Sequence, residues 1–342
     1  MLNVERLLKI DISQKNGRAF RRSLLRWYHQ HRRDLPWRRT RDPYAVLASE
    51  FMLQQTQVAT VLPYYKKWLQ RFPNFAALAR ASEAEALHAW QGLGYYARAR
   101  NLHATAKRVV DRQRGRFPHS IEQMQLLPGV GKYTAHALAT FAFDQPVAIV
   151  EANTSRVLSR FFDLRIPIDS TAGRNALWNY AAFLAPKKCS AAYNSALLDL
   201  GALVCLPCKP KCGICPVKKF CRAKNPESLP IKRPRPGTQQ VVEQHSFISR
   251  NDKLLLEKSA NRWRGMWILP AFKLDGLKPS SSRRRPVYKS VFPFTHHRVM
   301  LQVFRQRLRK INSHRQRWFP FCKLQSIPIP SPHRRAIEAL LN

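Results

Sequence analysis

The chain is poor in acidic residues. Of its 342 residues only 20 are Asp or Glu, whereas 60 are Lys or Arg, which gives a formal net charge of +40 at pH 7. A surface this positive repels itself and attracts polyanions. Because neutralised phosphates release their counterions, the charge favours DNA or RNA as the partner. A generally basic proteome and a membrane-surface protein are the alternatives.

Long apolar runs are missing as well. No stretch approaches the roughly 18 apolar residues that a membrane span needs. The N-terminal MLNVERLLKIDIS carries acids where a signal peptide has a continuous apolar core. We therefore expect a cytoplasmic protein that binds no membrane, and its seven cysteines then indicate metal ligands or free thiols more than disulfides.

The apolar pattern changes once along the chain, which is long enough for two or three domains. Residues 1–228 have apolar residues at helical spacings of three and four, and Ser82 with Glu85 resembles a capping box. Residues 229–240 are basic and rich in proline, which is typical of a linker. Residues 241–342 alternate with a period of two in places, which predicts a smaller α/β domain.

The string LLPGVGKYTAHALATFA (126–142) predicts a tight turn followed by a helix. Gly129 and Gly131 allow backbone N–H groups to approach a phosphate, and the helix N-terminus adds partial positive charge. With Lys132 beside them, they predict a helix-hairpin-helix element that grips the DNA backbone without reading sequence. An ordinary packing corner is the alternative.

Cysteines cluster between residues 205 and 221. Four of them have C-x6-C-x2-C-x5-C spacing, which suits a [4Fe–4S] cluster: Cys205, Cys212, Cys215 and Cys221. Cys208 lies between them, so two C-x2-C pairs also spell a small zinc ribbon, although the pairs are unusually close together. We expect Cys189 and Cys322 to be packing residues.

Two glutamates stand in unusual surroundings. Glu50 lies in an otherwise apolar and amide-rich segment (44–65), where burial would raise its pKa and suit it to general acid catalysis. A capped or salt-bridged surface glutamate is an equal alternative, and the neighbouring amides of Gln54 and Gln55 could bond to bases. Glu151 ends an apolar run at the mouth of a helix, where it could be a cap, a surface charge or a catalyst.

These segments together resemble one family, the MutY-type adenine DNA glycosylases of the helix-hairpin-helix superfamily. The resemblance follows LPWRR (35–39), SEFMLQQTQV (49–58), WQGLGYYARARNLH (90–103), LPGVGKYTA (127–135), NTSRVLSR (153–160) and the cysteine loop. It implies a mainly α-helical glycosylase region with an iron–sulfur loop. More loosely, RWRGMWILP (262–270) and FTHHRVMLQVF (294–304) resemble the Nudix-like domain of the family.

The resemblance implies removal of adenine mispaired with 8-oxoguanine or guanine in double-stranded DNA, by a monomeric enzyme at the nucleoid. The target base is extruded from the stack. The residue matching Glu50 protonates adenine and helps water to attack, through an oxocarbenium-like state. Gln55 and Tyr95 match residues that wedge into the stack, and Tyr133 matches one near the reacting sugar.

One catalytic position departs from the family. Its aspartate–Gly–Asn appears here as Glu151–Ala152–Asn153, which keeps the carboxylate and the asparagine but lengthens the acid by one methylene. The carboxylate stabilises positive charge on the sugar, where preorganised negative charge is needed. Because misplacement of about 1 Å can be costly, a lesion-binding homologue with weak or no catalysis, or a glycosylase for another mispaired base, is the alternative.

The C-terminal segment lacks the acidic helix of the Nudix hydrolases, so we expect no nucleotide hydrolysis. Phe294, Thr295 and His296 match the loop with which the family senses 8-oxoguanine. Lyase members of the superfamily carry a lysine at the position of Tyr133. Lys132 is one residue early, about 100° around a helix, so we predict a monofunctional glycosylase.

Overall fold

A computed structural model describes residues 14–234, 237–272, 285–307 and 314–342. The N-terminal stretch on which the signal-peptide interpretation depends lies outside these ranges. The chain packs as two units, one of Met1–Glu50 with Gln113–Pro234 and the other of Phe51–Arg112 with Arg235–Asn342. Among the described residues, no helix is both long and apolar enough to cross a membrane.

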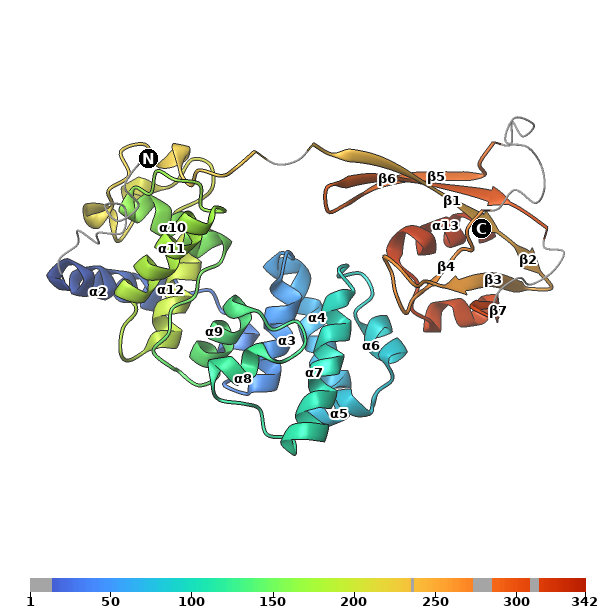
Figure 1. Cartoon of the computed structure of the whole chain (residues 1–342), viewed down its shortest axis with the longest axis horizontal. Helices are drawn as coiled ribbons and strands as arrows, with labels where there is room; N and C mark the ends of the chain where they lie inside the picture. The colour runs from blue at the N-terminus through green and yellow to red at the C-terminus, as the bar shows by residue number, and fades with distance from the viewer. Residues whose placement is uncertain (1–13, 235–236, 273–284, 308–313) are drawn as a thin grey trace. The chain divides into compact units, whose positions relative to one another are not determined.

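The first unit is helical. Its main elements are α2 (Gln14–His31), the start of α3 (Pro43–Leu53), α8 (Ile121–Gln125), α9 (Lys132–Phe141), α10 (Ala152–Phe162), α11 (Thr171–Leu184) and α12 (Ser190–Leu203). Helix α12 packs on α2 and α10, as Figure 1 shows. Their shared core includes the fully buried Phe20, Leu24 and Leu158, and burying each such side chain contributes roughly 2 kcal/mol.

Short 3₁₀ turns follow α12 in the cysteine segment: η2 (Cys212–Ile214), η3 (Lys218–Phe220) and η4 (Pro226–Ser228). A further turn, η1 (Pro36–Arg38), precedes α3. It begins at Pro36, whose fixed φ suits a first helical position. This turn sets Arg38 on a short, rigid element.

The helical part of the second unit contains α4 (Val58–Arg71), α5 (Phe75–Arg80), α6 (Glu83–Ala89) and α7 (Ala97–Gln113). The predicted capping box at α6 is confirmed, since Ser82 and Glu85 bond reciprocally. Trp68 and Trp90 are buried and meet edge to face, 5.3 Å between ring centroids. The predicted helical character is thus confirmed for the described residues 14–228.

The C-terminal part of the second unit is built on two small sheets. One has the order β1 (Gln239–Phe247), β6 (His297–Arg305), β5 (Tyr288–Phe294), with β1 parallel and β5 antiparallel to β6. The other joins β2 (Ser249–Arg250), β3 (Lys253–Lys258), β4 (Trp267–Ile268) and β7 (Gln316–Pro320). Turn η6 (Phe321–Ser326) and helix α13 (Ser331–Leu341) complete this predicted sheet region.

One expectation about side chains is wrong. Cys189 and Cys322 are exposed, so neither is a packing residue. Cys189 stands at the N-cap of α12 with a left-handed backbone (φ +59°), and Cys322 lies in the surface turn η6. The apolar character of cysteine suggested burial, but it gives no information on the exposed backbone positions that these two residues occupy.

Candidate active site

Glu50 is buried on α3, one turn before the helix ends, with 5% of its surface exposed. Burial raises the pKa of Glu50 to about 7, opposed by a hydrogen bond from Tyr133 and reinforced by the charge of Glu151. Nearby Arg38 also lowers this pKa. The structure therefore removes the surface alternative and leaves a carboxyl that keeps a proton near neutral pH.

Tyr133 comes from the predicted hairpin, at the second residue of α9. The turn before it has Gly129 at φ +74° and Gly131 at the N-cap, which offers the first-turn N–H groups no side-chain oxygen. Burial and the nearby glutamates raise the pKa of Tyr133, so its hydroxyl keeps its proton and can donate to Glu50. Lys132 points to the ring of Trp178, 4.1 Å from its Nζ, as its rotation about the helix predicts.

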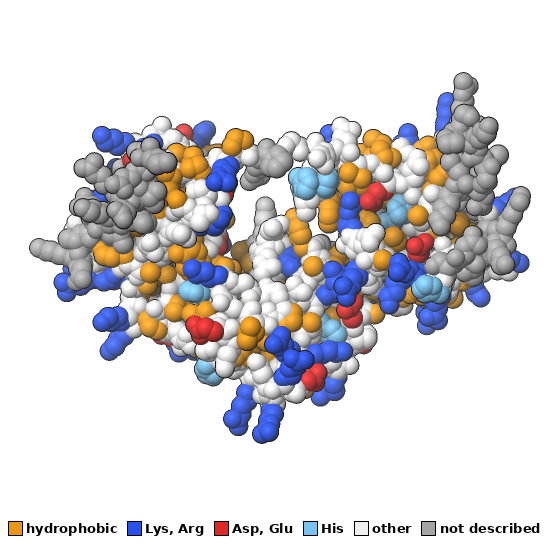
Figure 2. All heavy atoms as spheres, viewed as in Figure 1, with side chains coloured by type: hydrophobic (Ala, Val, Ile, Leu, Met, Phe, Trp, Pro, Cys, Tyr) orange, Lys and Arg blue, Asp and Glu red, His pale blue; other side chains and the backbone are white. Residues whose placement is uncertain are grey.

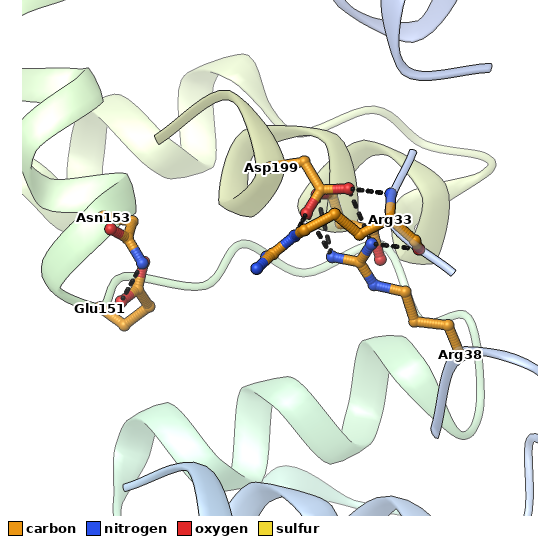
Figure 3. A network of polar contacts seen from close by, with 6 residues as sticks. Arg33, Arg38, Glu151, Asn153 and Asp199 are labelled. Carbon is orange, nitrogen blue, oxygen red and sulfur yellow. Dashed lines mark hydrogen bonds and ion pairs between the residues drawn. The ribbon is translucent and has the colours of Figure 1, made fainter. Parts of the chain in front are cut away.

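Glu151 is the N-cap of α10 and partly buried. Its Oε1 accepts from the N–H of Thr154 at 2.8 Å, and its own N–H donates to Thr154 Oγ1 at 2.7 Å. Its Oε2 accepts from Asn153 Nδ2 at 3.4 Å (Figure 3). Burial raises the pKa of Glu151 above its ordinary value, and the hydrogen bonds from the N–H groups of the first turn only partly oppose this rise. Glu151 is thus both a cap and a close electrostatic neighbour of Glu50.

Asn153 is fixed from the other side by the cysteine segment. Arg156 donates from Nη2 to Asn153 Oδ1 at 2.8 Å and from Nε to the carbonyl of Cys205 at 2.8 Å. Helix α12 approaches α10 so closely here that a Cβ added to Gly201 would lie 2.7 Å from Asn153 Cβ. The position of Asn153 therefore depends on the packing of α10, α12 and the cysteine segment.

The sequence did not point to a second polar network in the same unit. Asp199 on α12 is fully buried and accepts from Arg33 Nε at 2.6 Å and from both terminal nitrogens of Arg38, at 2.7 and 2.9 Å (Figure 3). Burial raises the pKa of Asp199, but the two arginines outweigh it and hold the pKa below its usual value. Asp199 thereby fixes Arg38, the cation near Glu50.

The four spaced cysteines are close to one another. Burial raises the pKa of Cys215 to about 11, with further contributions from the other three, Cys205, Cys221 and Cys212. Cys208 is exposed. Within the described ranges, no three His, Cys, Asp or Glu side chains are placed to hold one metal ion. Four thiols within electrostatic reach of one another are a donor set that suits either a [4Fe–4S] cluster or a zinc ion.

The predicted wedge residues belong to the second unit. Gln55 and Tyr95 are exposed, and both have left-handed backbones, at φ +56° and +48°. Gln54 precedes Gln55 and is partly buried. A positive φ is uncommon for residues of this kind and is found at turns and functional sites.

The C-terminal residues of the predicted site form a two-residue hairpin between β5 and β6. Phe294 pairs with His297, so Thr295 and His296 occupy the turn and are exposed. The ring of Phe294 lies 4.4 Å from the guanidinium of Arg262. Thr295 has φ +53°, which is strained for a β-branched residue.

Residues 48–179 match the family described as "HhH-GPD superfamily base excision DNA repair protein". The chain is 41% identical over 277 residues to "Adenine DNA glycosylase" of Mus musculus, covering 78% of this chain and 52% of that protein. It is 36% identical over 261 residues to "Adenine DNA glycosylase" of Buchnera aphidicola subsp. Baizongia pistaciae (strain Bp), covering 74% of each.

Among solved structures, the chain resembles "Structure of a thermostable thymine-DNA glycosylase" with a TM-score of 0.56 and 32% identity, over 61% of this chain and 96% of that one. The chain spans about half the length of the mouse relative. The match to the Buchnera protein extends over most of both chains. The chain therefore belongs to the HhH-GPD superfamily of base excision DNA repair proteins, as a MutY-type relative of the adenine DNA glycosylases.

Proposed function

We propose that the protein is a monofunctional DNA glycosylase that removes adenine mispaired with 8-oxoguanine or guanine. The observation that carries the proposal is the buried Glu50, with a pKa of about 7, hydrogen-bonded to Tyr133 and close to Glu151. Paired carboxyls with raised pKa values are typical of general acid catalysis at a glycosidic bond. We infer adenine as the released base from the relatives named adenine DNA glycosylase.

The chemistry uses Glu50 twice. Protonated Glu50 gives its proton to a ring nitrogen of the extruded adenine, and the N-glycosidic bond breaks with its electron pair going to the base. Positive charge is left on the sugar. Water then adds to the anomeric carbon and returns a proton to the Glu50 carboxylate, and Tyr133 orients that carboxylate by its hydrogen bond.

Glu151 is the carboxylate that stabilises the cationic sugar in this scheme. Its cap bonds with Thr154 fix the longer side chain, so the extra methylene does not leave it free to rotate. A preorganised charge stabilises a transition state without reorganisation. The alternative of a lesion-binding homologue is favoured by burial, because burial raises the pKa of Glu151 and so disfavours the charged carboxylate that the catalytic role needs.

DNA binding is supported by charge and by the hairpin. Lys and Arg side chains are spread over the visible face, with few acidic side chains between them (Figure 2). The turn with Gly129 and Gly131 would hold backbone phosphates at the N-terminus of α9. We assign the Phe294–Thr295–His296 turn to contact with 8-oxoguanine and the C-terminal sheets to a Nudix-like domain without hydrolase activity. Because the proposed substrate is double-stranded DNA, we assign the protein to the nucleoid.

We assign Cys205, Cys212, Cys215 and Cys221 to a [4Fe–4S] cluster. The four thiolates would hold the cluster, and its binding would cross-link the segment whose Cys205 carbonyl accepts from Arg156. Its test is iron, sulfide and zinc content with the visible absorption of thiolate-bound iron. Cys208→Ser should keep the cluster and Cys212→Ser should lose it, whereas zinc in place of iron would contradict the assignment.

The position of Lys132 supports glycosylase activity without strand cleavage. Its Nζ lies 4.1 Å from the centroid of the Trp178 ring. Trapping with borohydride measures any Schiff base with the opened sugar. Wild type should give little trapped complex, and efficient trapping that disappears in Lys132→Ala would contradict the monofunctional assignment.

A single-turnover substrate panel tests the proposal and separates its alternatives. Wild type should release adenine from duplexes containing A:8-oxoguanine and A:G, and release little from A:T. Tight binding of A:8-oxoguanine without release would support the lesion-binding homologue. Release of a base other than adenine would replace the assigned substrate, and Glu151→Asp in the same panel reports whether side-chain length limits the rate.

A further inference from the structure

A buried arginine that takes no part in the chemistry above joins two turns of the second unit. Arg98, on the first turn of α7, has only 6% of its surface exposed. Its Nη1 donates to the carbonyls of Phe51 (3.0 Å), Met52 (2.8 Å) and Gln54, and its Nη2 to Thr56 Oγ1 (3.1 Å) and the carbonyls of Leu93 (3.1 Å) and Gly94 (3.2 Å). One guanidinium therefore holds two chain segments about 40 residues apart in sequence.

The acceptors explain why an arginine is needed. Phe51, Met52 and Gln54 lie at the C-terminal end of α3, where carbonyls have no partner within the helix. A planar guanidinium offers several donors in a fixed fork, which a lysine cannot reproduce. Burial lowers the pKa of Arg98 to about 10, so the group stays charged at neutral pH although its described acceptors are uncharged oxygens.

Both turns carry a strained, exposed residue. Gln55 and Tyr95 have φ of +56° and +48°, and such backbones persist only where surrounding contacts fix them. Arg98 supplies contacts on both sides, because its guanidinium also lies 5.3 Å from the Tyr95 ring. Trp90 adds a hydrogen bond from Nε1 to the carbonyl of Gly94 at 3.1 Å.

We propose that Arg98 is a positioning residue that sets Gln55 and Tyr95 as a preformed two-part wedge for opening the duplex. This inference rests on the proposed function, in which these two side chains enter the stack. Extrusion of a base loses stacking and pairing energy. A wedge already ordered before DNA arrives avoids the further entropy loss of ordering two turns on binding.

Base unstacking is measured in a Glu50→Gln background, where the target adenine stays attached. 2-Aminopurine next to that adenine in an A:8-oxoguanine duplex brightens when the stack opens. Arg98→Gln should reduce the fluorescence rise at least about fivefold, and Arg98→Lys partly, while duplex affinity changes less than about threefold. Arg112→Gln, an exposed arginine on the same helix, is the matched control and should keep the full rise.

Variants of the wedge separate failure of this inference from failure of the proposed function. If Gln55→Ala and Tyr95→Ala leave the fluorescence rise intact, the wedge role itself is wrong. If they abolish it while Arg98→Lys has no effect, only the role of Arg98 is wrong. Arg98→Lys added to the Gln55→Ala/Tyr95→Ala double variant should change nothing further, because the coupled residues act as one unit.

A measurement on the unmodified chain covers the case in which Arg98→Gln does not fold. Hydrogen exchange of wild type without DNA reports on the Thr56 and Leu93 amides, which donate to the carbonyls of Leu53 and Trp90. Slow exchange at both turns is expected of a preformed wedge. Exchange at the rate of an unstructured peptide would overturn the proposal, as would a folded Arg98→Lys with the full fluorescence rise.

Discussion

Ionisation of the buried Glu50 side chain should destabilise the folded protein at high pH. Burial raises the pKa of Glu50 from its ordinary value near 4.5 to about 7, so the folded state holds this proton more tightly than the unfolded state. The contribution of protonated Glu50 to the free energy of unfolding is therefore fully present below pH 4.5 and is lost as the pH rises through 7. At about 1.4 kcal/mol per pKa unit, the loss above pH 7 amounts to about 3 kcal/mol.

Glu50→Gln removes the titration and keeps the shape, so it should become progressively more stable than wild type as the pH rises. Between pH 5 and pH 8, the difference in free energy of unfolding between the two proteins should grow by about 2–3 kcal/mol. Urea unfolding of both proteins at each pH measures it. A difference that is constant with pH to within about 0.5 kcal/mol would refute the claim that Glu50 is buried with a raised pKa.

Two further predictions concern the mouth of α10. Thr154→Val removes the acceptor of the Glu151 N–H and should cost about 1–2 kcal/mol of stability in urea unfolding. Adenine release should be about tenfold slower, because the backbone that carries the Glu151 side chain loses this anchor, although the Thr154 N–H still bonds to the carboxylate. Gly201→Ala places a Cβ 2.7 Å from that of Asn153, so it should lower the free energy of unfolding by about 1–3 kcal/mol and slow adenine release. Gly17→Ala is the control, because its Cβ would make only ordinary contacts. Equal effects of the two substitutions would contradict the packing argument.

The local patterns of the sequence predicted the helices and the hairpin, because each depends on residues near one another in the chain. Spacing alone left the surface alternative open for Glu50, and only the packing around it decides for burial. The cap formed by Glu151 and Thr154 is also local. A reciprocal pair three residues apart at a helix start is a signal that can be recognised in the sequence.

The long-range networks could not be predicted from the sequence. Asp199 lies more than 150 residues from Arg33 and Arg38, and nothing in their spacing indicates that they meet. Arg98 stands among other arginines of an amphipathic helix, where it is indistinguishable from a surface cation. Its role follows only from the carbonyls that the fold brings to it.

Single-turnover release of adenine from an A:8-oxoguanine duplex, with wild type and Glu50→Gln compared from pH 5 to pH 9, tests the central claim most directly. Wild type should release adenine with a rate constant that is highest below pH 7 and falls as Glu50 loses its proton. Glu50→Gln should bind the duplex and release at least about a hundredfold less. Release by Glu50→Gln at the wild-type rate would contradict the assignment of Glu50 as the catalytic acid.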